Sequence, residues 1–398
     1  TQDILVENGF ITQIAKSLKN PKKYPVIALE NLHVSSGWFD SSVSFGEPGY
    51  EERETIANGL QVAAASGFTD IALNANTNPV IDSHSDIAFV KSKAANSATN
   101  LHPIGALTKG SEGVDLAELF DMKSAGSIAF GDYKKPIENP NLLKIALQYA
   151  SSFDGLVHSF PHESRVATKG VMNENITSTR LGLKGLPALA EELQIARDLF
   201  LLEYTDGKLH IPTISTAKSV DLIREAKAKK LDVSCSVAIH NLLFTDESLN
   251  DFDTNFKVNP PLRTQSDIEA LIAGVKDGTI DMVTSDHNPI DIEYKKIEFD
   301  YAKNGTVGLE SAFGVLNALF TTKKAVQLLT KGKQRFGLKT DAIHIGSSAQ
   351  LTLFNPSETY VFEEKHIGSK SKNSLFIGSK LKGKVYGIIA NNTTSIAL

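Results

Sequence analysis

Residues 208–239 run KLHIPTISTAKSVDLIREAKAKKLDVSCSVAI, and this stretch contains two apolar, β-rich segments separated by a helical pattern. The β-rich segments occupy residues 208–214 and 231–239. Between them Val220 and Ile223 recur at helical spacing on one face, while the lysines fall on the others. The stretch therefore predicts a strand, a crossover helix and a second strand parallel to the first.

The same alternation extends through the middle of the chain. Amphipathic segments separate the β-rich ones, with Gly67 as a predicted C′ residue of one helix and Ser215 or Thr216 as N-cap of another. Eight buried strands alternating with helices predict an α/β fold, a (β/α)8 barrel, with a doubly wound open sheet as the structural alternative. The strand candidates are residues 37–43, 69–75, 101–107, 127–130, 155–159, 208–214, 231–239 and 280–285.

The two ends of the chain have a different pattern. Residues 1–35 and 342–398 contain short β-patterned runs with Gly and Asn turns, such as ILVENGFITQIA and SLFIGSKLKGKVYGIIANN. They predict a small sheet domain built from both termini, with the barrel in residues 36–341. Segment 318–329 is short for the last helices of a barrel, which leaves open whether a loop is missing there.

Composition excludes several classes of protein. The chain has 398 residues, a net charge of −5 and no basic block, so nucleic acid is not an expected partner. The single cysteine, Cys235, excludes an intrachain disulfide and a cysteine-based zinc cluster, and its apolar surroundings predict a core residue. No apolar run approaches the ~20 residues of a membrane span, and no signal-peptide pattern opens the sequence. We expect a cytoplasmic protein without a membrane partner.

The carboxyl ends of the strands are where a (β/α)8 barrel carries its chemistry. The first strand ends inside FDSSVSFGEPG (39–49). The polar residues at the strand ends and in the loops that follow are Ser42, Ser44, Asn76, Asn78, Asp132, Tyr133, His158, Thr213, His240, Asn241, Asn259, Ser285, Asp286 and His287.

Several motifs resemble those of one enzyme family. They include NANTNPVID (74–82), HIPTISTAKSVDLIREAK (210–227), SDHNPI (285–290) and GSSAQLTLFNP (346–356). In order and spacing they resemble the long, bacterial type of dihydroorotase, of the amidohydrolase superfamily, over nearly the whole chain. The resemblance implies a barrel with a small β-sandwich. It also implies a hydrolase of pyrimidine biosynthesis that opens or closes a cyclic amide and so interconverts dihydroorotate and carbamoyl aspartate. Such enzymes hold one or two zinc ions that activate water.

The resemblance also implies six metal-ligand positions, and most of them carry the wrong residue. Ser42 and Ser44 replace a His-x-His pair at the end of the first strand. Tyr133 and Thr213 occupy the fourth-strand and sixth-strand positions, and Asp132 beside Tyr133 is expected to point the other way. Of the six positions, only His158 and Asp286 keep a residue type that binds zinc. Because a catalytic zinc usually needs three protein ligands, we expect no cofactor, with zinc only if the site is functional after all.

Substrate recognition is altered in the same way. The position of an arginine that grips the substrate carboxylate in the family holds Gly46. A histidine with the same task aligns with Ile290. The retained substrate-binding positions are Asn76 and Asn259, which carry no positive charge. Asp286 is the remnant of the family's general base.

Each retained residue also has a purely structural interpretation. His158 can be a packed histidine, and Asp286 can cap the turn after its strand. Asn76 and Asn259 can stabilise their proline-containing turns. His162, His240 and His287 are the other histidines considered as substitute ligands; Pro161 disfavours a helical pairing of His162 with His158, and His287 is expected to face away from Asp286.

Three functions follow as hypotheses. The first is an inactive dihydroorotase homologue that acts as a structural or regulatory partner, with aspartate transcarbamoylase implied by the family, or that assembles with itself. The second is an active amidohydrolase that uses His158, Asp286 and His240 in a non-standard site. The third is a small-molecule binder that uses Asn76 and Asn259 without turnover.

Overall fold

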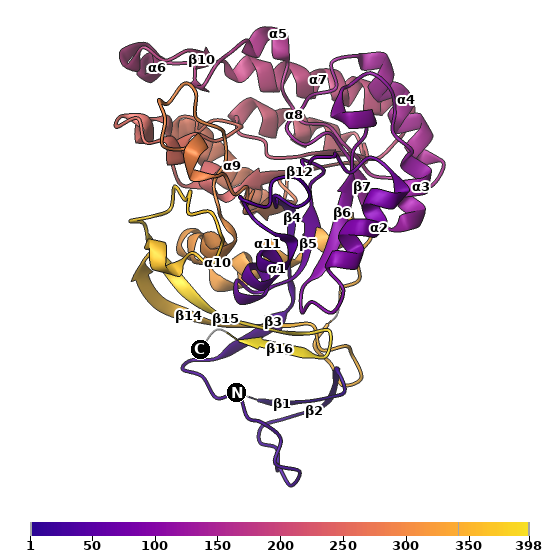
Figure 1. Ribbon diagram of the computed structural model, residues 1–398, viewed down its shortest axis with the longest axis vertical. Helices are drawn as coiled ribbons and strands as arrows, with labels where there is room; N and C mark the ends of the chain where they lie inside the picture. The colour runs from indigo at the N-terminus through magenta and orange to yellow at the C-terminus, as the bar shows by residue number, and fades with distance from the viewer. Residues whose placement is uncertain (1, 341, 397–398) are drawn as a thin grey trace.

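The computed structural model describes residues 2–340 and 342–396. Within these residues the strands form an eight-stranded sheet, a four-stranded sheet and two two-stranded sheets. The eight-stranded sheet and its helices make up the upper part of the molecule in Figure 1, and the four-stranded sheet lies below. Residue 341, where the predicted barrel segment ends, and the chain ends at 1 and 397–398 lie outside the described residues.

The eight-stranded sheet is parallel throughout and closes on itself. Each neighbouring pair of strands is parallel. The two outer strands of the order meet where Ser44 N–H donates to the carbonyl of His287 at 2.7 Å, which excludes the open-sheet alternative. The strands are β4 (Trp38–Val43), β5 (Phe68–Leu73), β6 (Asn100–Gly105), β7 (Ala129–Phe130), β8 (Val157–His158), β11 (Leu209–Ile211), β12 (Val233–Ala238) and β13 (Met282–Thr284). All eight strand predictions are confirmed.

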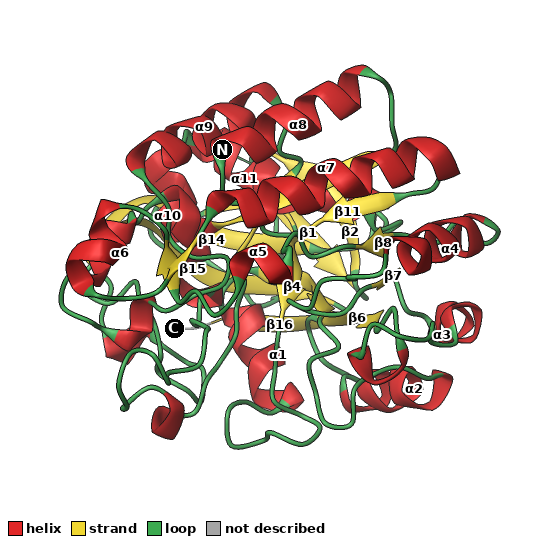
Figure 2. Ribbon diagram, turned by 90° about the horizontal axis from the view of Figure 1, so that it is seen from above, coloured by secondary structure: helices red, strands yellow, loops and turns green. Residues whose placement is uncertain are grey.

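Helices surround this barrel, as Figure 2 shows from above. Thr216 caps the helix predicted from the opening stretch, accepting from Ser219 N–H, and Gly67 takes the left-handed conformation after the first barrel helix, with φ +92°. The helices are α1 (Ile56–Ala65), α2 (His84–Lys93), α3 (Leu119–Ala125), α4 (Pro140–Ser151), α7 (Ala188–Thr205), α8 (Ala217–Ala228), α9 (Gln265–Asp277), α10 (Leu309–Leu319), α11 (Thr322–Thr330) and α12 (Gly332–Arg335). None of those within the described residues has the length and apolarity to cross a membrane.

An excursion between β8 and α7 adds small elements above the barrel. It contains α5 (Ser164–Ala167), α6 (Ile176–Leu181) and a short parallel pair, β9 (Met172–Asn173) with β10 (Gly185–Leu186). Arg263 holds this excursion against the barrel. Its guanidinium is buried and donates to Asn173 Oδ1 and to the carbonyl of Leu186, each at 2.9 Å.

The four-stranded sheet combines both ends of the chain. It consists of β3 (His33–Ser36), β14 (Leu351–Val361), β15 (Lys380–Ala390) and β16 (Thr393–Ile396), all antiparallel. The hairpin of β1 (Asp3–Glu7) and β2 (Phe10–Ala15) joins it through Ile11 N–H, which donates to the carbonyl of Ser347. Trp38 of the barrel stacks on Phe313 and contacts Phe354 of β14, so an aromatic cluster joins the two parts.

Candidate functional site: a small pocket at the barrel mouth

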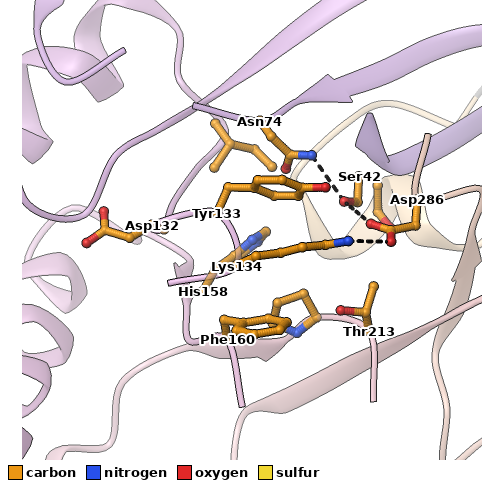
Figure 3. A pocket seen from close by; sticks show the side chains of 13 residues that line it. Ser42, Asn74, Asp132, Tyr133, Lys134, His158, Phe160, Thr213 and Asp286 are labelled. Carbon is orange, nitrogen blue, oxygen red and sulfur yellow. Dashed lines mark hydrogen bonds and ion pairs between the residues drawn. The ribbon is translucent and has the colours of Figure 1, made fainter. Parts of the chain in front are cut away.

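A small pocket lies at the carboxyl ends of the barrel strands, where the barrel fold places chemistry (Figure 3). Its volume is about 30 Å³, which is room for one or two water molecules. The residues that line it are Ser41, Ser42, Asn74, Ile104, Gly131, Asp132, Tyr133, Lys134, His158, Phe160, Pro212, Thr213 and Asp286.

The two serines of the first strand face the same way, as the two-residue period of a strand predicts. Asn74, just after β5, donates from Nδ2 to Ser42 Oγ and to Ser44 Oγ, both at 3.1 Å. Ser42 Oγ also lies 3.5 Å from Asp286 Oδ1. An amide thus holds together the two hydroxyls that stand at the histidine positions of the family.

A lysine forms the centre of the polar network. Lys134 Nζ lies 2.7 Å from Asp286 Oδ2, and the two side chains are only 12% and 2% exposed. Burial opposes its charge, but the Asp286 carboxylate outweighs burial and raises the pKa of Lys134 above its ordinary value. Burial also raises the pKa of Asp286, with Lys134 acting in the opposite direction. The pair is an ion pair shielded from solvent.

The ammonium of Lys134 reaches this place because of its backbone. Lys134 has φ +53°, a left-handed conformation that non-glycine residues adopt rarely, and Thr213 and Asp286 at two other strand ends share it with φ +50° and +49°. Such outliers cluster at functional sites of proteins, because the surrounding structure must hold them in place. Three of the residues around this small pocket therefore keep a backbone typical of a functional site.

Tyr133 and Asp132, which precede Lys134, point in different directions. Tyr133 is directed into the pocket (Figure 3), where its hydroxyl has no hydrogen-bond partner and burial raises the pKa of Tyr133 to about 12. Asp132 accepts instead from the backbone N–H groups of Leu107 at 2.9 Å and Thr108 at 3.1 Å. This confirms the expectation that Asp132 turns away.

His158 lines the pocket as a packed, neutral histidine. Its ring lies 4.7 Å from the ring of His210 and 5.5 Å from that of Phe336, and its Nε2 has no hydrogen-bond partner. Burial lowers the pKa of His158 to about 3. Thr213 lies in the same lining, and its backbone N–H donates to Ser236 Oγ at 3.1 Å.

The other predicted residues lie outside the pocket lining. Asn76 and Asn259, retained from the family's substrate contacts, do not line it. His162 is half-buried and also absent from the lining. His240 is buried, with neither ring nitrogen hydrogen-bonded. His287 turns away from Asp286, as expected, and accepts at Nδ1 from Gly308 N–H at 3.3 Å.

The two positions that hold the substrate carboxylate in the family are closed by local packing. A Cβ atom built on Gly46 would lie 1.7 Å from the carbonyl oxygen of Tyr50. Gly46 N–H donates to the carbonyl of Glu54, which draws this loop tight. Ile290 is buried and its N–H donates to Asn373 Oδ1 at 3.0 Å. Neither position offers a side chain that pairs with an acid.

The residues present do not match a zinc site. Among the described residues no three His, Cys, Asp or Glu side chains gather closely enough to hold a metal ion. Zinc prefers imidazole, thiolate and carboxylate ligands, whereas the neighbours of Asp286 are a serine hydroxyl at 3.5 Å and an ammonium at 2.7 Å. A cation beside the carboxylate would also meet the positive charge of Lys134.

Reasoning from the sequence missed Lys134 and Asn74. It placed the fourth strand at residues 127–130 but still used strand alternation for Asp132 and Tyr133, although β7 ends at Phe130. Beyond that point alternation no longer applies, and the left-handed φ of Lys134 turns its side chain into the barrel. The one available signal was a lysine directly after the aligned tyrosine in GDYKKP.

The closed parallel barrel, joined to a sheet from both termini and carrying its pocket at the strand ends, has the architecture of the amidohydrolase superfamily. An L-hydantoinase from Arthrobacter aurescens has the same fold, with a TM-score of 0.84 at 19% identity over 98% of this chain and 91% of that one. A dihydropyrimidinase from Brevibacillus agri has a TM-score of 0.82 at 21% identity, over 98% and 90% of the chains.

Sequence comparison gives the family. The family described as Dihydro-orotase-like matches residues 33–219. The chain is 40% identical to a dihydroorotase from Acetivibrio thermocellus, over 99% of this chain and 94% of that one. It is 39% identical to a dihydroorotase from Geotalea daltonii, over 96% and 92%. The chain belongs to the dihydroorotase family.

Proposed function

We propose that this member of the dihydroorotase family does not hydrolyse a cyclic amide and acts as a non-catalytic partner protein. The observation that carries the proposal is the ion pair of Lys134 and Asp286 inside the pocket (Figure 3). In the family the aspartate at this position accepts a proton from zinc-bound water. Here its carboxylate is held by an ammonium group that cannot accept a proton or bind a metal.

The size of the pocket supports the same conclusion. A cavity of about 30 Å³ is far below the ~300 Å³ of typical small-molecule sites. A six-membered ring with a carboxylate does not fit unless Tyr133 or Lys134 moves. The size also argues against a small-molecule binder that uses this cavity.

The experiment measures zinc and turnover on the full-length protein. We expect zinc well below one ion per chain, and no hydrolysis of dihydroorotate or condensation of carbamoyl aspartate above the blank with zinc added. The Acetivibrio thermocellus dihydroorotase serves as a positive control. Near-stoichiometric zinc together with turnover would establish the second candidate, an active hydrolase with an unusual site, which the names of its relatives favour.

The partner that we propose is aspartate transcarbamoylase, as the family implies. The test is size-exclusion chromatography of the chain mixed with aspartate transcarbamoylase of the same organism. We expect the two to elute together, earlier than either alone. Separate elution at every ratio would exclude aspartate transcarbamoylase as the partner. It would not bear on the proposal that the chain does not catalyse hydrolysis.

A further inference from the structure

Two long loops at the barrel mouth each contain a buried lysine. The first loop, residues 239–264, joins β12 to α9, and the second loop, residues 285–308, joins β13 to α10. Lys257 of the first loop and Lys295 of the second are only 5% and 4% exposed. Lysine is rarely buried without a partner, because its ammonium group loses its hydration. The surroundings of these two lysines therefore require an explanation.

The contacts of the two ammonium groups are reciprocal. Lys257 Nζ donates to the carbonyls of Phe299, at 2.6 Å, and Asp300, at 2.9 Å, in the second loop. Lys295 Nζ donates to the carbonyls of Thr254, at 2.9 Å, and Lys257, at 3.4 Å, in the first loop. Each loop thus supplies one ammonium group and two carbonyl groups to the other. We call these contacts of Lys257 and Lys295 the lysine clasp.

The clasp lies within a wider contact between the two loops. Thr254 Oγ1 donates to the carbonyl of Lys295 at 2.5 Å, and Gly305 N–H donates to the carbonyl of Lys257 at 3.0 Å. All four acceptors of the two ammonium groups are neutral backbone carbonyls, and none is a carboxylate. The clasp therefore joins the loops but does not neutralise the charge that it buries.

The charged form of Lys295 is disfavoured in this place. Burial, and next the positive charge of Lys257, lower the pKa of Lys295 from its ordinary 10.5 to about 7. Asp253 of the first loop opposes this change, and Lys134 of the loop after β7 adds to it. Burial also lowers the pKa of Lys257, against the charge of Asp300. When the loops separate, Lys295 meets water and its pKa returns to the ordinary value.

We infer that the lysine clasp holds the two loops together in a pH-dependent way, tightly in mildly alkaline solution and more loosely near neutral pH. The closed loops favour the neutral amine of Lys295, whereas the open loops favour the ammonium. Between pH 7 and 10.5 the open form therefore binds more protons, and raising the pH favours the closed form. The opening equilibrium constant falls by up to about tenfold per pH unit. Below pH 7 both forms are protonated, and opening no longer depends on Lys295.

The clasp acts next to the pocket at the strand ends. The second loop begins with Ser285 and Asp286, and Asp286 lines that pocket. The clasp thus links pH in the neutral range to the freedom of a loop that starts at the site. This inference holds whether or not the chain catalyses hydrolysis, since neither lysine lines the pocket.

The test is hydrogen exchange of the full-length protein between pH 6 and pH 9, with each rate divided by the intrinsic rate at the same pH. Gly305 N–H is the reporter, because opening breaks its bond to the first loop. We expect its protection to be constant below about pH 7 and to rise by up to about tenfold per pH unit above it. Ala106 N–H, which donates to the carbonyl of Ile81, is the internal control, with constant protection expected.

Three variants assign the effect to the clasp. Lys295→Met keeps the length of the side chain without a titrating group, and we expect the protection of Gly305 to become independent of pH. Lys296→Met is the matched control, since Lys296 is exposed, and we expect it to follow the parent. Lys257→Met removes the like charge beside Lys295, so we expect the rise to begin at a higher pH. Circular dichroism verifies the folding of each variant.

Two outcomes would overturn the inference. One is a parent protein whose protection at Gly305 does not change between pH 7 and pH 9. The other is a rise that persists unchanged in Lys295→Met. If Lys295→Met does not fold, a rise in the parent that begins at the same pH in Lys257→Met would equally overturn it.

Discussion

At the scale of single residues, the site is defined by an exchange of one cation for another. In the family a metal balances the carboxylate at the end of the eighth strand, and here Lys134 balances Asp286. A buried carboxylate needs a partner, because an unpaired buried charge costs several kcal/mol. In this chain the ammonium group of Lys134 is the partner of the buried Asp286 carboxylate.

Replacing Lys134 tests this dependence. We expect Lys134→Met to lower the free energy of unfolding by about 3 kcal/mol, because it leaves Asp286 buried without a cation. The neighbouring Lys135→Met is the control, expected to lose about 1 kcal/mol, since Lys135 Nζ only donates to a backbone carbonyl. The measurement is urea unfolding at pH 7. Recovery of most of the loss in the double variant Lys134→Met with Asp286→Leu would confirm the cause, and equal losses at 134 and 135 would contradict it.

Gly46 permits a second test at this scale. We expect Gly46→Ala to destabilise the protein by roughly 2 kcal/mol or more, because a Cβ atom 1.7 Å from the Tyr50 carbonyl forces the loop to shift. Gly368→Ala is the control, since its nearest neighbour is one methyl group of Val62 at 3.3 Å. Thermal unfolding of both variants measures the difference. An unchanged Tm for Gly46→Ala would show that the loop can open to admit a larger residue.

At the scale of elements, three of the strand ends bury neutral histidines, His158, His240 and His287. Burial lowers the pKa of His158 and the pKa of His240 to about 3 and the pKa of His287 to about 4. These side chains belong to β8, to the 3-10 turn Ile239–Leu242 and to the loop after β13. Each strand end therefore resists protonation in the folded state.

This arrangement predicts acid sensitivity. Because the folded-state pKa values lie below the usual 6.5, the unfolded chain binds protons first. The contribution of these neutral histidines to the free energy of unfolding is fully present above pH 6.5. It is lost as the pH falls toward 4, by up to about 1.4 kcal/mol per pH unit for each histidine. We expect His240→Met to reduce this slope by one histidine's share in urea unfolding between about pH 6 and pH 4. A slope unchanged by the substitution would show that His240 does not contribute.

At the scale of the whole molecule, one aromatic cluster connects the barrel with the sheet from both termini. Trp38, the only tryptophan, is fully buried, and its ring lies 4.8 Å from that of Phe313 and 5.6 Å from that of Phe354. Phe354 belongs to β14 and Trp38 to β4. Packing of this kind couples the unfolding of the two parts.

We therefore expect Phe354→Ala to lower the free energy of unfolding of the whole molecule by about 3–5 kcal/mol. Tryptophan fluorescence reports the junction and far-ultraviolet circular dichroism reports the whole chain, and the two transitions are expected to coincide. Phe252→Ala is the control, since Phe252 is 45% exposed, with an expected change within about 0.5 kcal/mol. Two separate transitions in the parent protein would show that the parts unfold independently.

The sequence by itself determined the barrel and its strands. Runs such as residues 231–239 are apolar throughout because a parallel strand is covered on both faces, and caps such as Thr216 and Gly67 depend on local geometry that one residue type satisfies best. The sequence also placed the serine pair correctly, since Ser42 lies in β4 and Ser44 directly follows its last residue, Val43, so the two-residue period still applies.

Only the tertiary structure decided what fills the site and what lies exposed. Lys134 and Asn74 enter the pocket from segments beyond the ends of their strands. Strand alternation does not apply there, so the sequence does not show which way their side chains point. Helix α7 has large apolar residues on its exposed side, such as Phe200 and Tyr204, as well as on its buried side, such as Leu202, so periodicity alone could not tell which side meets the barrel. Both depend on contacts between residues far apart in the chain: Lys134 lies 152 positions from Asp286, and distance along the sequence carries no information about such a meeting.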